Sequence, residues 1–299
     1  MNLIGKKYLF FVISAILIIP GIVSLFLYGL NLSIEFTGGS RLTFAFSKNA
    51  TNDQIIKIRN VFEESKIKVS TIEKSEKNVF VRTQPLDQKE DLQLQSKLKS
   101  EFSDFKQLEF ETIGPTIGNE ITLNAIKAII IASFLIVLYI TYSFRQVPKP
   151  ASSIRFGIAA IIALIHDVLL LLGVFSIFGH FLGVEIDSLF VTAVLTVIGF
   201  SVHDTIVVFD RIRENLKRQG GEHFANTVND SILQTLDRSV NTSLTVVLVL
   251  SSLLIFGGET IRWFVVALLI GIISGTYSSI FNAAPLLVVW QEIISKRRS

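Results

Sequence analysis

Residues 196–215 read TVIGFSVHDTIVVFDRIREN, and this stretch decides the class of the fold. It is apolar enough to lie in a bilayer, yet it carries His203 and Asp204 shortly before Asp210, where the sequence becomes polar and basic. A charged side chain in the hydrocarbon costs several kcal/mol even on lenient insertion scales. The stretch therefore predicts a membrane-spanning helix whose ionisable pair has a function or a structural partner.

The composition of the whole chain indicates the same class. Half of the 299 residues are hydrophobic, and the mean hydropathy is +0.55. The net charge is only +3, so we do not expect nucleic acid as a partner. Cysteine is absent, which excludes disulfides and cysteine-based zinc sites. We expect an integral membrane protein, in contact with the lipid bilayer, that has no metal or other cofactor.

Apolar runs long enough to cross a bilayer about 30 Å thick recur along the chain. They cover residues 8–30, 121–144, 154–178, 188–209, 239–257 and 263–290. The first run follows two lysines, as a signal peptide does, but it is longer than a signal-peptide core and lacks a small-x-small cleavage site. We therefore expect an uncleaved helix at residues 1–30 and an all-α membrane bundle of six transmembrane helices.

Basic residues indicate which loops face the cytoplasm. The loop FRQVPKPASSIR (144–155), the stretch that starts at Arg211 and the C-terminal SKRRS are basic, whereas the loops at 179–187 and 257–262 are not. We therefore place both termini in the cytoplasm. Residues 31–120 then lie on the far side of the membrane, and residues 121–299 form a five-helix transmembrane domain.

The connection between the fourth and fifth runs contains an amphipathic pattern of its own. It breaks at Gly220 and Gly221. Beyond the break, apolar residues recur every four positions, at Phe224, Val228, Ile232 and Leu236. This period predicts a helix, within about residues 211–236, that lies on the cytoplasmic membrane surface or packs against the bundle.

The polar segment 31–120 predicts a small folded domain. Alternating apolar residues predict strands at RLTFAF, KVSTIEK, NVFVRT and QLEFETI. Capping residues and helical periods predict helices at TNDQIIKIRNVFEESK and LDQKEDLQLQSKLKSEF. The order βαββαβ is that of a ferredoxin-like α+β sandwich. The segment has no histidine, and its carboxylates alternate with lysines, so we expect a structural core without a catalytic site.

Few ionisable residues fall inside the predicted spans. His166 and Asp167 lie near the middle of the third span, and Arg238 lies at the cytoplasmic mouth of the fifth. Burial disfavours a charged carboxylate and a nearby arginine favours it, so a balanced group can bind and release a proton near neutral pH. We predict a proton relay of Asp204 and Arg238, with Asp167 as a relay or a packing contact. His166 and His203 are packing residues or relays.

Other short features leave two readings open. Small and hydroxylated residues on the last three spans suit either a rigid bundle or a water path; they include Ser201, Ser243, Ser274 and Ser278. Glycine-rich turns at the ends of the polar domain are hinges or plain turns; their residues are Gly38, Gly39, Gly114, Pro115 and Gly118.

Motifs of enzymes are missing from the sequence. It contains no HExxH, no phosphate loop that ends in GK[ST] and no GxSxG, so we do not expect an enzyme. An intramembrane aspartyl protease would also need two membrane carboxylates, as Asp167 and Asp204 offer. Such proteases carry a Gly-x-Gly-Asp segment, which this sequence lacks.

Six motifs together resemble the SecF family of membrane subunits of the bacterial protein-export machinery, and through it the resistance-nodulation-division (RND) transporter superfamily. They are GLNLSIEFTGGS (29–40), IGPTIGNE (113–120), ALIHDV (163–168), VIGFSVHDTIVVFDRIREN (197–215), TLDRSVNTSLT (235–245) and FGG (256–258). The sequence departs from the family pattern at Glu35, where aspartate is expected, at His203, where asparagine is usual, and at Ser239, where threonine is usual.

The resemblance implies a subunit that pairs with SecD and supplies one RND-like half of a bundle in the bacterial cytoplasmic membrane. The pair would assist the SecYEG channel and the SecA ATPase in moving a preprotein, with proton influx as the energy source. Carried over by position, Asp204 is the proton carrier and Arg238 its charge partner, while Asp167 has a less defined role. An RND-type proton-coupled exporter of small molecules or lipids and a non-transporting assembly factor are the alternatives.

Overall fold

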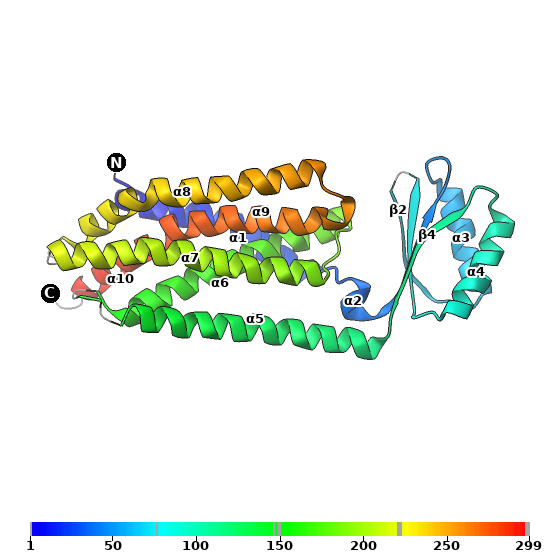
Figure 1. The fold of residues 1–299 in the computed structure, drawn as a ribbon, viewed down its shortest axis with the longest axis horizontal. Helices are drawn as coiled ribbons and strands as arrows, with labels where there is room; N and C mark the ends of the chain where they lie inside the picture. Colours follow the sequence, from blue (N-terminus) through cyan, green and yellow to red (C-terminus); the bar gives the residue numbers. More distant parts are fainter. Residues whose placement is uncertain (1, 76, 146, 149–150, 220–222, 297–299) are drawn as a thin grey trace. The chain divides into compact units, whose positions relative to one another are not determined.

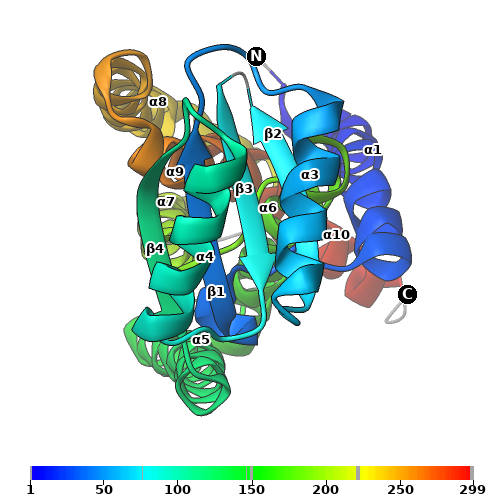
Figure 2. The same ribbon diagram turned by 90° about the vertical axis from the view of Figure 1, so that its right-hand side faces the viewer.

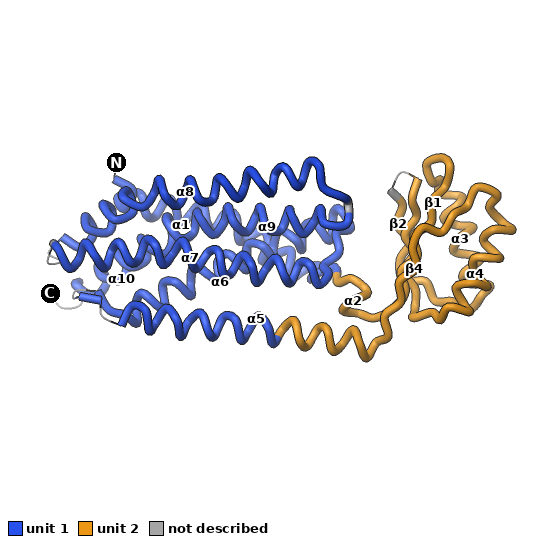
Figure 3. The backbone as a smooth tube through the Cα atoms, in the orientation of Figure 1, with its two compact units in different colours: residues 1–31, 127–299 blue, residues 32–126 orange. Residues whose placement is uncertain are grey.

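The computed structural model describes residues 2–75, 77–145, 147–148, 151–219 and 223–296. The chain divides into two compact units, residues 32–126 and residues 1–31 together with 127–299 (Figure 3). We call the first the α+β domain and the second the helical unit. The predicted break at Gly220 and Gly221 lies outside the described residues.

The α+β domain is a four-stranded antiparallel sheet with two longer helices on one face (Figure 2). The strand order is β2-β3-β1-β4. Its elements are α2 (Ile34–Thr37), β1 (Gly39–Ala45), α3 (Asn52–Glu64), β2 (Val69–Ser75), β3 (Asn78–Thr83), α4 (Gln88–Glu101) and β4 (Lys106–Ile113). This chain order and strand order confirm the predicted ferredoxin-like fold.

Local signals in the sequence explain where the two longer helices of this domain begin. Thr51 and Gln54 form a reciprocal capping box at the start of α3, and Asp87 and Glu90 form another at the start of α4. Alternate strand residues meet the apolar faces of these helices. They form a core with side chains at most 1% exposed, among them Leu42, Phe44, Ile58, Phe62, Val79, Val81, Leu94 and Leu98.

The other face of the sheet is ionic. Arg41 Nη2 lies 2.8 Å from a Glu111 oxygen and 3.9 Å from a Glu109 oxygen. Burial raises the pKa of Glu111, whereas the Arg41 charge opposes that rise. Because neighbouring residues of a strand point to opposite faces, the same alternation that buries Leu42 places Arg41 in this ionic layer.

The helical unit contains the long apolar helices (Figure 1). They are α1 (Lys7–Tyr28), which follows the short 3₁₀ turn η1 (Ile4–Lys6), α5 (Pro115–Ser143), whose first turns belong to the α+β domain, α6 (Ser153–Leu182), α7 (Ser188–Gln219), α8 (Phe224–Phe256), α9 (Glu259–Ser278), a π-helical turn η2 (Ser279–Ala283) and α10 (Ala284–Lys296). Among the described residues, six candidate spans are long and apolar enough to cross a membrane, the last running from Thr260 to Lys296. The predicted number of membrane helices is confirmed.

The amphipathic pattern expected within about residues 211–236, on the membrane surface or against the bundle, belongs to longer helices in the described chain. α7 continues as a helix to Gln219, and α8 already begins at Phe224. Phe224, Val228 and Ile232 are at most 8% exposed, so their stripe packs into the bundle. An apolar period near 3.6 cannot distinguish a short helix from the extension of a membrane helix, because both have it.

Glycines allow the membrane helices α1 and α6 to approach closely. A Cβ atom at Gly173 of α6 would lie only 2.6 Å from Cα of Gly21 of α1. One turn further, the hydroxyl oxygens of Ser24 and Ser176 are 2.8 Å apart. Small side chains permit such contacts between membrane helices, where van der Waals packing and hydrogen bonds drive association.

We predict that Gly173→Ala destabilises the helical unit, because the added methyl group collides with the α1 backbone; overpacking of this kind costs about 1–3 kcal/mol. Gly199 of α7 is the matched control, since a Cβ there meets nothing within 4 Å and alanine favours the helix. Thermal unfolding of the purified protein in detergent measures both effects. An unchanged melting temperature for Gly173→Ala would contradict the close contact of α1 and α6.

Candidate functional site

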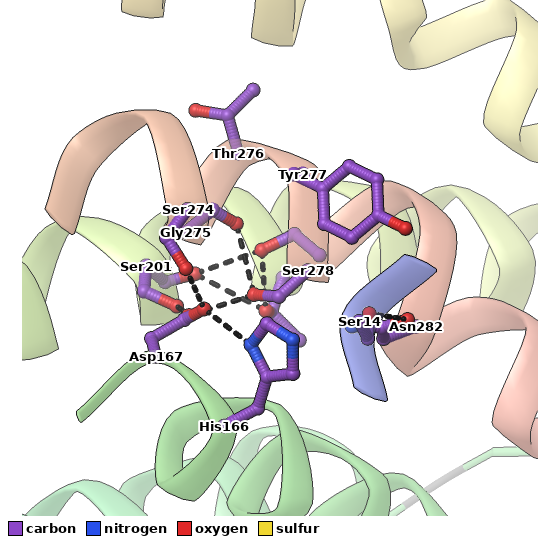
Figure 4. Close-up of polar contacts among 12 residues, drawn as sticks. Ser14, His166, Asp167, Ser201, Ser274, Gly275, Thr276, Tyr277, Ser278 and Asn282 are labelled. Carbon is purple, nitrogen blue, oxygen red and sulfur yellow. Dashed lines mark hydrogen bonds and ion pairs between the residues drawn. The ribbon is translucent and has the colours of Figure 1, made fainter. Parts of the chain in front are cut away.

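Asp167 lies at the centre of a polar cluster between α6, α7 and α9 (Figure 4). The residue is 0% exposed. Its Oδ2 accepts hydrogen bonds from Ser201 at 2.5 Å and Ser278 at 2.7 Å, and its Oδ1 accepts one from Ser274 at 2.8 Å. Nδ1 of His166 lies 3.0 Å from Oδ1. Each carboxylate oxygen therefore has two neighbours that can donate.

The number of donors matches an ionised carboxylate. Such a group accepts about four hydrogen bonds and donates none. Three hydroxyl groups and Nδ1–H of His166 supply that number, so the cluster assigns the imidazole proton to Nδ1. The charge of Asp167 is thus compensated by hydrogen-bond donors, as a polar group buried in an apolar bundle requires.

The spacing of residues on α9 and one close approach build this cluster. Ser274 and Ser278 are four positions apart, so their hydroxyl groups lie on the same side of the helix. Between them, Gly275 permits contact with α7, because a Cβ atom there would lie 2.9 Å from Cβ of Ser201. The glycine brings the donors of α7 and α9 to the same carboxylate.

Asp204 lies further along α7 and has fewer donors. The residue is 2% exposed. Its Oδ2 accepts a hydrogen bond from Thr276 of α9 at 3.1 Å and a longer one from Ser243 of α8 at 3.5 Å. The two hydroxyl oxygens are themselves 2.5 Å apart. No hydrogen bond of the described residues reaches Oδ1 of Asp204, so this carboxyl group is less completely compensated than that of Asp167.

Arg238 and His203 do not touch Asp204 in the described part of the chain. Arg238 is exposed on α8, and His203 is exposed on α7, the helix of Asp204 itself. Neither residue forms an ion pair with Asp204 within 4.0 Å. The relay of Asp204 and Arg238 stays a prediction. The groups that contact Asp204 directly are the hydroxyl groups of Thr276 and Ser243.

Sequence patterns singled out Ser201, Ser243, Ser274 and Ser278 only as small, hydroxylated residues that suit a rigid bundle or a water path, and they did not single out Thr276. Which carboxylate each hydroxyl group reaches depends on the packing of helices far apart in the sequence, which no local period specifies. The signal that was present is the regular spacing of hydroxylated residues on an otherwise apolar α9. Within the described residues, no group of three or more His, Asp or Glu side chains could hold a metal ion.

The predicted hinge residues pack closely within the α+β domain. Gly38 and Gly39 have φ angles of +70° and +128°, which favour glycine. A Cβ atom at Gly38 would lie 2.9 Å from Cα of Pro115, and one at Gly118 would lie 2.9 Å from the Gly38 nitrogen. Gly114 alone of these glycines has open space around it. The hinge role stays a prediction. A bend at Gly38 would have to separate Gly38 from Pro115 and Gly118.

Comparison with known proteins identifies one family. The model described as "Protein export membrane protein SecD/SecF, C-terminal" matches residues 93–293, and the "SecD/SecF GG Motif" matches residues 23–50. Protein translocase subunit SecF of Thermobaculum terrenum is 46% identical, with 97% of this chain and 94% of the relative covered. SecF of Anaerolinea thermophila is 42% identical at the same coverage.

Longer relatives contain a region similar to nearly the whole of this chain. Protein translocase subunit SecDF of Bacillus subtilis is 35% identical over 96% of this chain, which spans 38% of that relative. The crystal structure of SecDF, a translocon-associated membrane protein from Thermus thermophilus, matches with a TM-score of 0.82 and 35% identity, over 98% of this chain and 39% of that one. From its motifs, its fold and its identity to these relatives, this chain belongs to the SecD/SecF family of protein-export membrane proteins.

Proposed function

We propose that this chain acts as a SecF-type auxiliary subunit of a bacterial protein translocase and has no enzymatic activity of its own. With SecD, it uses the proton-motive force to promote preprotein translocation across the cytoplasmic membrane. Two kinds of support exist: 42–46% identity to SecF subunits over nearly the full length, and ionisable groups buried inside a membrane bundle. The observation that carries the proton role is the buried, incompletely compensated carboxyl group of Asp204.

Asp204 is the proposed proton carrier because its contacts join three helices. Thr276 contributes from α9 and Ser243 from α8, while Asp204 itself belongs to α7. Protonation removes the negative charge, which weakens both hydroxyl hydrogen bonds and the attraction to Arg238. A change of charge at one atom thereby biases the packing of α7, α8 and α9, the kind of two-state element that coupling needs.

The same proposal assigns the movement to the ends of the α+β domain. A shift of the membrane helices would reach this domain through α5, which runs without interruption from Pro115 to Ser143. Gly114 precedes that helix and has room for a change of backbone angle. We propose Gly114 as the bending point. The closely packed residues Gly38, Gly39 and Gly118 form a contact that either opens or stays closed during this bend.

A polar face on α7 and α8 supports SecD as the partner. We call it the α7/α8 polar face, and its members, all exposed in the isolated chain, are Thr192, Thr196, Gly199, His203, Arg238, Asn241, Thr242 and Thr245. Polar residues inside a span face protein or water rather than lipid, and small residues favour helix contacts. By contrast, the exposed face of α1 between Leu9 and Leu27 is apolar, as lipid requires. In SecDF relatives, a region like this chain is part of a longer polypeptide. We therefore propose that SecD binds to the α7/α8 polar face.

The remaining partners and the orientation rest on the family and on charge. Arg211, Arg213 and Arg218 at the end of α7 support a cytoplasmic location of that end, and hence of both termini. We propose SecYEG, SecA and the preprotein as functional partners. The α+β domain then lies outside the cytoplasm, where a preprotein emerges.

We expect Asp204→Asn to abolish the part of translocation that depends on a proton gradient, because the amide cannot bind and release a proton. Preprotein transport into membrane vesicles that contain SecYEG, SecD, SecA and the variant measures this, with and without an uncoupler. Asp210→Asn on the same helix is the control. Asp210 pairs with Arg213 at 2.5 Å on an exposed surface, so its loss should cost less than about 1 kcal/mol and leave transport unchanged. Full gradient stimulation in Asp204→Asn would refute the carrier role.

We also expect a cysteine on the α7/α8 polar face to form cross-links to SecD. The natural chain has no cysteine, so single-cysteine variants can be labelled cleanly with a photoactivatable maleimide. Thr196→Cys should yield a SecD adduct in native membranes, whereas Ile16→Cys, on the apolar face of α1 and 64% exposed, should not. SecD adducts at Ile16→Cys alone, or equal yields at both positions, would place the partner elsewhere.

A further inference from the structure

A groove runs along the helical unit between α1 and α6, and η2 and the start of α10 complete its wall. We call it the α1/α6 groove. It has a volume of about 200 Å³ and is open on one side; its wall includes Phe11, Ser14, Ala159, Ile162, Ala163 and Leu286. Ile162 is 46% exposed, so it lies at the rim of the open side. All of these residues belong to candidate membrane spans, so the open side faces the bilayer.

The groove exists because α1 and α6 separate toward their N-terminal ends. The two helices touch at Gly21 and Gly173. Two turns nearer its N-terminus, α1 contacts η2 instead, where the side chains of Ser14 and Asn282 are bonded at 3.0 Å. Figure 4 shows these two residues next to each other. The contact with η2 holds α1 away from α6 and leaves the space between them.

The wall of the groove offers almost no polar surface. Ser14 and Asn282 bond to each other twice, at 3.0 and 2.8 Å. Nδ1 of His166 faces Asp167, and Nε2 of the same ring is covered. A water molecule needs two to four polar partners to be held in a cavity. The groove therefore suits an apolar occupant.

The size of the groove favours an acyl chain over a protein helix. A helix with its side chains is about 10–12 Å across, so it could insert only single side chains into this space. An acyl chain is thin and flexible and can follow the groove along its length. Empty apolar space would forfeit the van der Waals contacts of its wall. In the bilayer, acyl chains are present at the open side.

Basic residues lie one turn beyond the N-terminal end of the groove. Lys7 is four positions before Phe11, and Arg155 is four positions before Ala159. Residues four apart share one face of a helix, so both basic residues continue the two sides of the groove. This end of both helices is the cytoplasmic end in the proposed orientation.

Adjacent residues of α10 hold the two basic side chains at this end. Nζ of Lys7 lies 2.5 Å from Glu292, and Nη1 of Arg155 donates to Oε1 of Gln291 at 2.6 Å. Lys6, Lys7 and Arg155 carry three positive charges, against the one negative charge of Glu292. Basic pockets between membrane helices on the cytoplasmic side bind the headgroups of anionic lipids. The charge at this end matches such a headgroup.

We propose that the α1/α6 groove binds an anionic phospholipid of the cytoplasmic leaflet, with one acyl chain between α1 and α6 and its phosphate group beside Arg155. The apolar wall selects the chain, and the basic end selects the headgroup. The bound chain completes the packing of α1 against α6 where the two helices separate. This site is distinct from the α7/α8 polar face and does not depend on the proton role of Asp204.

Photolabelling tests the site, with phosphatidylglycerol that carries a diazirine on its acyl chain. The lipid is added to the full chain in detergent, alone and with SecD bound, and mass spectrometry locates the adducts. We expect saturable labelling at Phe11, Ile162 and Leu286, and only weak, non-saturable labelling at Ile16, which is 64% exposed on another side of α1. Unlabelled phosphatidylglycerol should compete better than phosphatidylcholine.

Two outcomes of this experiment would overturn the proposal. Equal labelling of Ile16 and of the groove wall would show only the lipid that surrounds any membrane protein. Labelling that is lost when SecD binds would show that a helix of SecD covers the groove.

Two variants test the chain and the headgroup separately. Ile162→Trp narrows the open side and should abolish the saturable labelling; its exposed position should leave the melting temperature unchanged, which is measured alongside. Arg155→Gln should weaken competition by phosphatidylglycerol about fivefold, the effect of one basic residue near anionic lipid, and leave phosphatidylcholine unaffected. Arg218→Gln is the control, because its side chain is 69% exposed at the end of α7. Unchanged labelling in Ile162→Trp, or equal competition curves for Arg155→Gln and Arg218→Gln, would contradict the proposal.

Discussion

A carboxylate buried in an apolar bundle needs hydrogen-bond donors, and the membrane part of this structure is organised around that need. Asp167 receives them from three helices, through Ser201, Ser274, Ser278 and His166. Donors can reach it only where helices approach closely. The small residues between α7 and α9 are therefore as necessary as the polar ones. At Asp167, the buried charge depends on its hydrogen bonds, and the hydrogen bonds depend on the close packing of the helices.

The two membrane carboxyl groups are suited to different tasks. Asp167 has enough donors for both oxygens, and it orients the ring of His166. Asp204 has hydroxyl donors on one oxygen only, at longer distances. Proton-coupled work needs one group that changes state and a framework that does not. The contrast in donor number supports our proposal that Asp204 has the first task and Asp167 the second.

Periodicity and capping residues predicted the elements well. The apolar runs, the capping residues Thr51 and Asp87 and the alternation in RLTFAF act over a few residues. Over the part of the chain that it describes, the structure confirms six candidate spans and the βαββαβ domain. The contacts of Asp204 were not predictable in the same way. Thr276 is 72 positions away in sequence, and only the rotation of α9 decides whether it faces Asp204. Likewise, the sequence alone does not predict that His203 is exposed. Its exposure is explained by the proposal that SecD covers the α7/α8 polar face.

Infrared difference spectroscopy of the protein reconstituted with SecD, recorded while the pH is changed, tests this division of tasks most directly. A protonated carboxyl group absorbs separately from a carboxylate, so the titrating residue can be identified by substitution. The account predicts a carboxyl band that appears with falling pH in the natural protein, persists in the Asp210→Asn control and is absent in Asp204→Asn. A band that survives unchanged in Asp204→Asn would contradict it, because another carboxyl group would then bind the proton.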